Sequence, residues 1–231
     1  MTETPSQPYR NKYGLYRVPP GVEHRPAVKA IMSGLPYEPL TIEFMRAHAG
    51  RGDIVHAGAF FGDFIPALSA ALSPEAWLWT FEPNPANFAA AQETVSLNRV
   101  ANATLANVAL SDRDSTVLVR TVAADGRPLG GASRLVDEAG EGVETVRSVM
   151  LDHVVPPART VSILHLDVEG HEKPALLGAV GIVNRCKPIL ILETFEDIAW
   201  LNRTFDQIDY RLVGEVHFNQ VFAVAGSGVQ V

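Results

Sequence analysis

Short, almost continuously apolar runs alternate along the chain with segments of helical spacing, and this alternation most constrains the fold. We predict buried strands at residues 54–58, 77–81, 104–109, 161–166 and 189–192. Helices are predicted between or after them, at residues 63–72, 85–98, 172–183 and 195–205. Strands that alternate with helices form a parallel sheet covered on both faces. The chain is therefore predicted to be an α/β protein with a doubly wound, mostly parallel sheet.

The two ends of the chain depart from this alternation. Residues 1–37 are predicted to form an N-terminal arm or cap, because the first part of this segment is polar and rich in proline. A helix at 38–49 would then open the main domain, residues 38–231. Residues 210–216 and 220–225 are predicted to form a C-terminal antiparallel hairpin.

An insertion is predicted in the middle of the chain, at about residues 113–150. Strands at 115–122 and 145–150 flank a glycine-rich stretch, residues 125–142, which is too long for a simple turn. Long loops in compact domains are often lids or binding loops, so we expect a lid-like loop. A disordered excursion is the alternative.

Composition excludes several classes of partner. The 231 residues are 47% hydrophobic and carry a formal net charge of −7. Nucleic-acid binding usually requires a basic stripe, which the sequence lacks, so we expect no nucleic-acid partner. No run reaches the roughly 20 apolar residues that span a bilayer, so we expect no membrane partner and a cytoplasmic location.

Cys186 is the single cysteine and is expected to be a small buried residue. A homodimer is compatible with this size.

Two glycines follow the first predicted strand, in the segment HAGAFFGDF at residues 56–64. Gly58 and Gly62 lack side chains where a ligand would approach the backbone, and the next helix offers its N-terminal amides. Sheets of this kind bind ligands at the carboxyl ends of their strands. The same glycines are equally consistent with an ordinary tight turn.

Glu82 ends the second predicted strand, 24 residues after Gly58. An acidic residue in this position can accept hydrogen bonds from both ribose hydroxyls of an adenosine. The alternative is a surface carboxylate that caps the next helix, but Asn84 already fits the cap position, which favours the ribose interpretation. A dinucleotide fits less well, because Phe60 and Phe61 add bulk in a loop whose pyrophosphate-binding form needs another glycine.

Several segments of the chain match one protein family in that family's own order. They are YEP at 37–39, GDIVHAGAFFGDF from Gly52, TFEPNPANF from Thr80, LN at 97–98, NVALSD from Asn107, SVMLD from Ser148, ILHLDVEGHE from Ile163 and KPILILE from Lys187. On these residues the sequence resembles the FkbM-type methyltransferase family, a branch of the class I S-adenosylmethionine-dependent enzymes. DVEG combined with FEPNP is the most specific part of the resemblance.

The resemblance implies a Rossmann-like, seven-stranded sheet and S-adenosyl-L-methionine as the cofactor. The residues that it implies around the cofactor are His56, Gly58, Ala59, Phe60, Gly62, Asp63, Glu82, Pro83, Asn107, Val108, Ala109 and Asp167. By position, residues 58–63 would surround the methionine portion, Glu82 the ribose, and residues 107–109 the adenine. The implied activity is methyl transfer to a small polar acceptor, typically to an oxygen of a sugar-like or natural-product molecule.

Ionisable side chains are dense after the strand that precedes DVEG. Methyl transfer is an in-line displacement, so its rate depends mainly on positioning, and a hydroxyl acceptor must also lose a proton. Glu169 or His171 is the predicted base, and Asp167 is predicted to orient the cofactor or the acceptor. Glu172 is interpreted as a solvated residue of the first helical turn. Glu193 is a second candidate for lining the pocket. No metal site is predicted.

Two positions depart from the family's pattern. His56 stands where the family usually has an acidic residue, and His165 where it usually has a lysine. On adjacent parallel strands, two neutral imidazoles would avoid the desolvation penalty of a buried ion pair, and one could donate to the other. Two independent core histidines are the alternative.

Two rival functions stay open. The first is a nicotinamide-dependent oxidoreductase on a similar sheet, against which the glycine spacing and the DVEG segment argue. The second is a non-catalytic family member that binds a nucleoside or a partner protein, and the exchange at His56 favours it.

Overall fold

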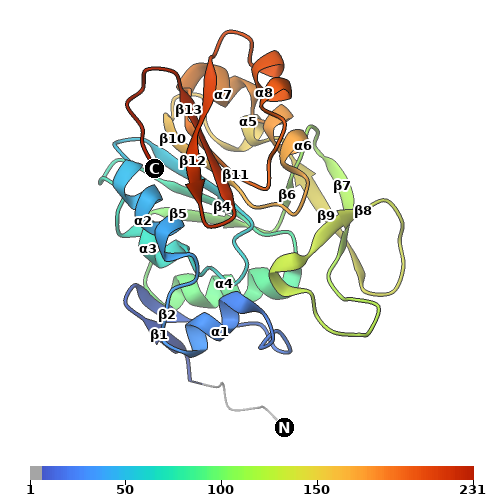
Figure 1. The fold of residues 1–231 in the computed structure, drawn as a ribbon. Helices are drawn as coiled ribbons and strands as arrows, with labels where there is room; N and C mark the ends of the chain where they lie inside the picture. Colours follow the sequence, from blue (N-terminus) through green and yellow to red (C-terminus); the bar gives the residue numbers. More distant parts are fainter. Residues whose placement is uncertain (1–6) are drawn as a thin grey trace.

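The computed structural model describes residues 7–231, and its centre is a seven-stranded sheet (Figure 1). The strands follow the order β12-β13-β11-β10-β3-β4-β5. Their bounds are β3 Asp53–Ala57, β4 Leu78–Phe81, β5 Ala103–Ala106, β10 Val161–Leu166, β11 Ile189–Glu193, β12 Tyr210–Val216 and β13 Asn219–Val224. The strands from β11 to β5 pair in parallel, and β12 and β13 form an antiparallel hairpin on β11. The predicted sheet and its C-terminal hairpin are confirmed.

Helices cover both faces of this sheet, and each face has its own core. The helices are α1 Pro26–Met32, α2 Pro39–His48, α3 Ile65–Ser69, α4 Pro85–Leu97, α5 Leu151–Val154, α6 Glu172–Leu177, α7 Val180–Cys186 and α8 Ile198–Thr204. Ile54 and Ile163 pack with side chains of α2 and α3, whereas Val55 and Leu164 pack with α6, α7 and α8. Consecutive residues of a strand point to opposite faces, so burial on both faces explains why the strands are apolar throughout.

The predicted strand at 104–109 is divided in the structure. β5 belongs to the large sheet, and the next residues form β6 (Ala109–Leu110) in a second sheet. Between them, the Asn107 carboxamide donates hydrogen bonds to the carbonyl oxygens of Glu82 and Pro83, at 2.8 and 3.0 Å. These bonds hold the chain in a bend, which an apolar pattern does not reveal.

Three predicted helices also change their bounds. The helix at 172–183 is divided into α6 and α7 at Gly178, where the carbonyl oxygen of Ser111 lies so close that any side chain would overlap it. α8 begins at Ile198 because the carboxylate of Asp197 accepts the Trp200 N–H and caps the helix. α3 is shorter than predicted, covering only Ile65–Ser69.

A second sheet, in the order β6-β9-β7-β8, follows β5 (Figure 1, right). Its longer strands are β7 Ser115–Arg120 and β9 Val143–Val149, close to the two predicted strands. The glycine-rich stretch between them contains a 3₁₀ turn, Gly130–Ala132, and a short strand, β8 Arg134–Val136, that pairs with β7. This stretch is therefore structured and not a disordered excursion; its role as a lid stays a prediction.

The N-terminal segment forms a small unit of its own. β1 (Tyr9–Asn11) and β2 (Gly14–Tyr16) make an antiparallel hairpin beside α4, and α1 follows it (Figure 1, bottom). Tyr16 and Val28 pack in one cluster with Phe61. This packing brings Arg25, at the start of α1, to the carboxyl ends of the central strands.

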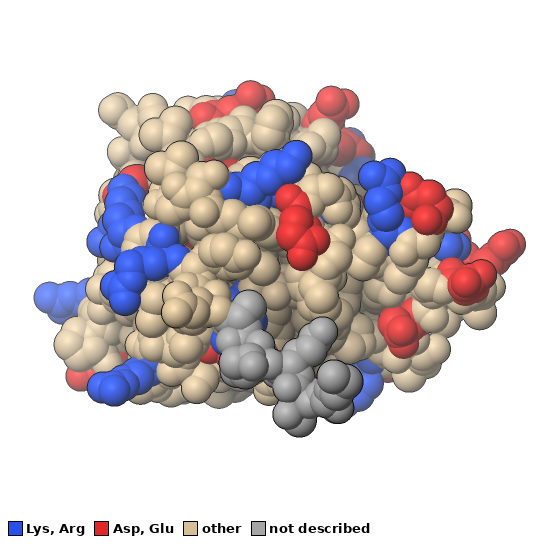
Figure 2. Space-filling model, turned by 90° about the horizontal axis from the view of Figure 1, so that it is seen from below, with Lys and Arg blue, Asp and Glu red and all other residues tan. Residues whose placement is uncertain are grey.

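No helix among the described residues is long and apolar enough to cross a membrane. The face in Figure 2 carries lysine and arginine side chains dispersed between acidic and uncharged ones. Cys186 is half-buried and packs against the margin of the core, so the expectation of a buried cysteine is met only in part.

Candidate functional site

Two adjoining cavities open where the parallel strands end, which is where such sheets bind ligands. The first, called the acidic cavity, has about 740 Å³ of space, part of it open to solvent, and the second, called the apolar cavity, has about 450 Å³. Gly58, Glu82, Gly131 and Asp167 line both. The acidic cavity is further lined by Arg25, Tyr37, Glu38, His56, Phe60, Asp63, His165, Glu169 and Glu193, and the apolar cavity by Pro83, Val108, Ala109, Leu110, Leu135, Val168 and His171.

The loop after β3 forms the boundary between the cavities. Gly58 has a φ of 88°, and a Cβ built on it would overlap the carbonyl oxygen of Asp167. Only glycine combines this conformation with so close an approach of two backbones. Phe60 also has a positive φ, 45°, and its N–H donates to Glu82 Oε2 at 2.7 Å. The loop therefore joins the ends of β3, β4 and β10 into one surface.

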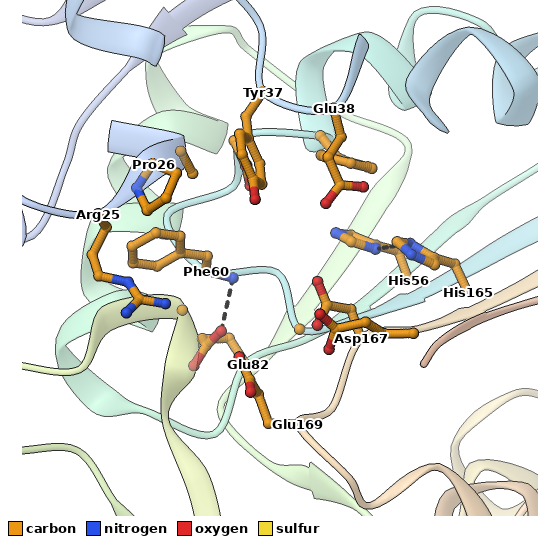
Figure 3. A pocket seen from close by; sticks show the side chains of 16 residues that line it. Arg25, Pro26, Tyr37, Glu38, His56, Phe60, Glu82, His165, Asp167 and Glu169 are labelled. Atoms are coloured by element: carbon orange, nitrogen blue, oxygen red, sulfur yellow. Dashed lines mark hydrogen bonds between the residues drawn. The ribbon is translucent and has the colours of Figure 1, made fainter. Parts of the chain in front are cut away.

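Glu82 points into the protein at the junction of the cavities (Figure 3). It is 4% exposed, and its Oε1 accepts the Asn84 N–H at 2.9 Å and an Asn87 amide hydrogen at 3.2 Å. Burial raises the pKa of Glu82 to about 7, although these hydrogen bonds oppose the shift. The side chain of Asn84 caps α4 by accepting the Ala86 N–H, so Glu82 is not the cap.

The apolar cavity suits a flat, weakly polar ring. Three of the predicted cofactor residues line it: Pro83, Val108 and Ala109. Leu135 from β8 adds an apolar wall that the sequence did not indicate. Three predicted cofactor residues line neither cavity: Ala59, Gly62 and Asn107. Ala59 and Gly62 shape the turn after β3, in which the Gly62 N–H donates to the Ala59 carbonyl oxygen. Asn107 instead donates hydrogen bonds to the backbone at the end of β4, as described above.

Acidic side chains gather in the acidic cavity. Asp167, Glu169 and Glu193 each offer a carboxylate oxygen within 4.8 Å of the others. Burial, and then the charge of Glu193, raise the pKa of Asp167 well above its ordinary value. Burial likewise raises the pKa of Glu169 and of Asp63 to about 7 in each case. Such a group can share protons or hold a cationic group.

The predicted catalytic residues do not all come together. Asp167 and Glu169 share the acidic cavity, whereas His171 lines the apolar cavity, with its Nε2 at 3.1 Å from Ser111 Oγ. Burial lowers the pKa of His171. Glu172 is buried rather than solvated, because its Oε1 accepts backbone N–H groups of the DVEG turn, among them that of Gly170 at 3.3 Å. The interpretation of Glu172 as a solvated residue is wrong.

His56 and His165 form a pair. They lie opposite each other on β3 and β10, with their Nδ1 atoms 2.8 Å apart and their ring planes within 10° of parallel. Burial lowers the pKa of His165 to about 4 and the pKa of His56 well below its ordinary value, so both rings are neutral near pH 7. The ring of Phe64 stacks on the ring of His56, with the two ring centroids 5.1 Å apart. The paired interpretation is confirmed, and two independent histidines are excluded.

Sequence reasoning missed the N-terminal side of the site. Arg25, Tyr37 and Glu38 line the acidic cavity, and Arg25 is the one lysine or arginine that does so within residues 7–231 (Figure 3). Tyr37 and Glu38 stood in a segment that matched the family, but nothing gave them a role. No sequence pattern indicated Arg25, because its position depends on how α1 packs against α4 and the loop after β3.

A family model for the methyltransferase FkbM domain matches residues 56–223 of the chain. The chain belongs to the FkbM methyltransferase family. A crystal structure of methyltransferase FkbM from Methylobacillus flagellatus KT is similar to it, with a TM-score of 0.51 and 17% identity over 75% of this chain and 43% of that one. The fold of this FkbM family member is thus the class I methyltransferase fold, and the chain spans less than half the length of that relative.

Other solved structures are similar to the FkbM family member with lower TM-scores. A SAM-dependent methyltransferase from Aquifex aeolicus has a TM-score of 0.44 and 11% identity, over 81% of this chain and 89% of that one. The O-methyltransferase TomG from Streptomyces achromogenes, solved with SAM, has a TM-score of 0.46 and 13% identity, over 82% and 79%. The sequence has no match among the curated proteins.

Proposed function

We propose that this FkbM family member catalyses S-adenosylmethionine-dependent methyl transfer to a small polar acceptor, with an oxygen rather than a nitrogen as the acceptor atom. The observation that carries the proposal is the inward-facing carboxylate of Glu82 between an apolar and an acidic cavity. A ribose at Glu82 would leave an adenine in the apolar cavity and a cationic sulfonium toward the carboxylates. Each part of the cofactor would then meet side chains of complementary chemistry.

When bound, S-adenosylmethionine supplies a methyl group on a cationic sulfur, which becomes a neutral thioether on transfer. Glu82 would accept hydrogen bonds from the ribose, and Gly58 would let the ligand approach the backbone. Glu169 is our candidate for the base that removes the acceptor's hydroxyl proton, because a carboxyl with a pKa of about 7 exchanges protons well at neutral pH. Asp167, beside it, would orient the acceptor.

Titration calorimetry with S-adenosylhomocysteine tests the cofactor assignment. Replacing Glu82→Gln should weaken binding about tenfold to a hundredfold, since it removes a charge-assisted acceptor from the ribose. Glu75→Gln, an exposed residue outside both cavities, is the matched control and should bind as the wild type does. Equal affinity in the two variants, or tighter binding of a nicotinamide dinucleotide than of S-adenosylhomocysteine, would contradict the proposal.

Methyl transfer to a panel of small hydroxylated acceptors tests the catalytic assignment. Glu169→Gln should lower kcat by about a hundredfold or more while S-adenosylhomocysteine binds within about twofold of wild type. Mass spectrometry of the product identifies the methylated atom. A wild-type protein that binds the cofactor tightly but methylates nothing would instead favour the non-catalytic alternative.

A further inference from the structure

The N-terminal segment gives the acidic cavity a wall of its own, called the cap wall, which is formed by Arg25, Pro26, Ala27 and Tyr37. The proposed function gives these residues no role. Arg25 and Tyr37 are half-buried, and Figure 3 shows both side chains directed into the cavity. Within residues 7–231, neither the guanidinium of Arg25 nor the hydroxyl of Tyr37 has a hydrogen-bond partner. The cap wall therefore presents donors that are free to bind a ligand.

Local packing fixes the position of Arg25. Its backbone N–H donates to the carbonyl oxygen of Val22 at 2.9 Å, and Pro26 begins α1 directly after it. Val22 is 1% exposed and packs in one cluster with Phe60, which also lines the cavity. The backbone that carries the guanidinium is thus ordered before a ligand binds, and such pre-organisation favours affinity.

A second guanidinium without a counter-ion lies nearby, on the inserted sheet. Arg134 of β8 stands directly opposite Arg120 of β7, and neither forms an ion pair in the part of the chain that the structure describes. Like charges opposite each other on two strands are destabilising. The charges of Arg25 and Arg134 both lower the pKa of Glu169 against the effect of burial, yet neither guanidinium forms an ion pair with it. Two unpaired cations therefore lie near the same carboxyl.

The chemistry of this side of the cavity differs from that of the strand ends. A guanidinium carries a fixed positive charge, and its planar fork binds a carboxylate or a phosphate through two parallel hydrogen bonds. The hydroxyl of Tyr37 is a further donor. Asp167 and the other carboxylates lie across the cavity from Arg25, so an anion at the cap wall keeps away from them (Figure 3).

We propose that Arg25, together with Tyr37 and Arg134, binds an anionic group of the methyl acceptor, either a carboxylate or a phosphate. The acceptor would place this anion at the cap wall and its hydroxyl near Glu169. These three residues determine specificity and take no part in the proton transfer. The assignment of the anion to the acceptor rests on the proposed function, whereas the anion site itself does not.

Calorimetry with inorganic phosphate and with acetate tests the anion site on the full chain, saturated with S-adenosylhomocysteine. That ligand brings its own carboxylate, so an anion that still binds occupies another site. Arg25→Gln and Arg134→Gln should each weaken anion binding about threefold, and the double variant about tenfold. The double variant Arg203→Gln/Arg211→Gln removes the same charge from exposed positions outside both cavities and should bind as the wild type does.

The outcomes are distinct. Equal affinity of the Arg25/Arg134 double variant and the wild type for both anions would overturn the proposal. Displacement of the anion by S-adenosylhomocysteine would also overturn it, because the site would then belong to the cofactor. If S-adenosylhomocysteine fails to bind while the double variant still loses phosphate or acetate, the proposed function fails and the anion site stands. The anion that binds more tightly identifies the acceptor's group as phosphate or carboxylate.

Turnover tests the assignment of the anion to the acceptor. Hydroxylated acids are compared with their uncharged amides, and hydroxylated phosphate esters with the corresponding alcohols. In the wild type, kcat/KM should be about tenfold higher for the charged member of a pair, and the double variant should remove most of this difference. A wild-type preference for the uncharged members would contradict the assignment.

Discussion

The apolar and acidic cavities adjoin, yet they are built in different ways. The apolar cavity is lined largely by residues at or just after strand ends, such as Pro83, Val108 and Val168, with Leu135 from the inserted sheet. The acidic cavity takes one wall from strand ends and another from the N-terminal segment, including Arg25 and Tyr37. The difference teaches that the topology of the central sheet places most of one half of the site, whereas the other half depends on packing between distant segments.

The largest expected effect comes from the position that both cavities share. Gly58→Ala should lower the free energy of unfolding by about 3 kcal/mol and abolish cofactor binding, since its Cβ would overlap the Asp167 carbonyl at a φ of 88°. Urea unfolding and calorimetry measure both. The matched control is Gly126→Ala, at a φ of 81° with nothing within 4 Å, which should cost about 1 kcal/mol and leave binding intact. Equal losses in the two variants would show that conformation, not close approach, matters at Gly58.

A pH series separates the two cavities by their charge. Asp63 and Glu82 have folded-state pKa values of about 7, above the ordinary values of 3.8 and 4.5. Near pH 7 the folded protein therefore binds more protons at these two carboxyls than the unfolded chain does. His56 and His165, whose pKa values are lowered, oppose this effect only below about pH 6.5, so stability falls as pH rises from about 6.5 to 8. The melting temperature of the unliganded protein should drop by about 5 °C over this range.

Two variants sharpen that measurement. Asp63→Asn, in the acidic cavity, should reduce the dependence on pH by about half, because this group can no longer ionise while Glu82 still does. Leu135→Ala, in the apolar cavity, should lower the melting temperature equally at every pH. An unchanged slope in Asp63→Asn would locate the titrating group elsewhere.

The smallest effect is expected at Arg25, whose charge lowers the pKa of Glu169 against the dominant effect of burial. In Arg25→Gln that pKa should rise by less than about one unit, so the acid limb of the kcat profile should move to higher pH. Binding of S-adenosylhomocysteine should change less than about twofold. A large loss of binding would instead mean that Arg25 contacts the cofactor.

The parallel direction of the central strands could be predicted from sequence, because apolar runs that alternate with segments of helical spacing are typical of a parallel sheet covered on both faces. A pair of His56 and His165 was one of two interpretations that the sequence allowed, since equal distances from two strand ends put residues in register. The contact between their Nδ1 atoms distinguishes the pair from two independent histidines. The division of the strand at 104–109 was not, because it depends on a side chain that bonds to backbone 24 and 25 residues earlier. Arg25 and the burial of Glu172 likewise depend on tertiary contacts that no local pattern encodes.

The contact between Glu38 and Asn219 joins residues 181 positions apart. Closing so long a loop is entropically costly, and a ribosome releases Glu38 many seconds before Asn219. A nascent chain that has already paired β3 with β10 would therefore hold His56 and His165 in place without Asn219, whose Oδ1 lies 3.3 Å from His165 Nε2. We expect the histidine pair to acquire its final proton arrangement only in the last stage of folding, when the C-terminal hairpin docks.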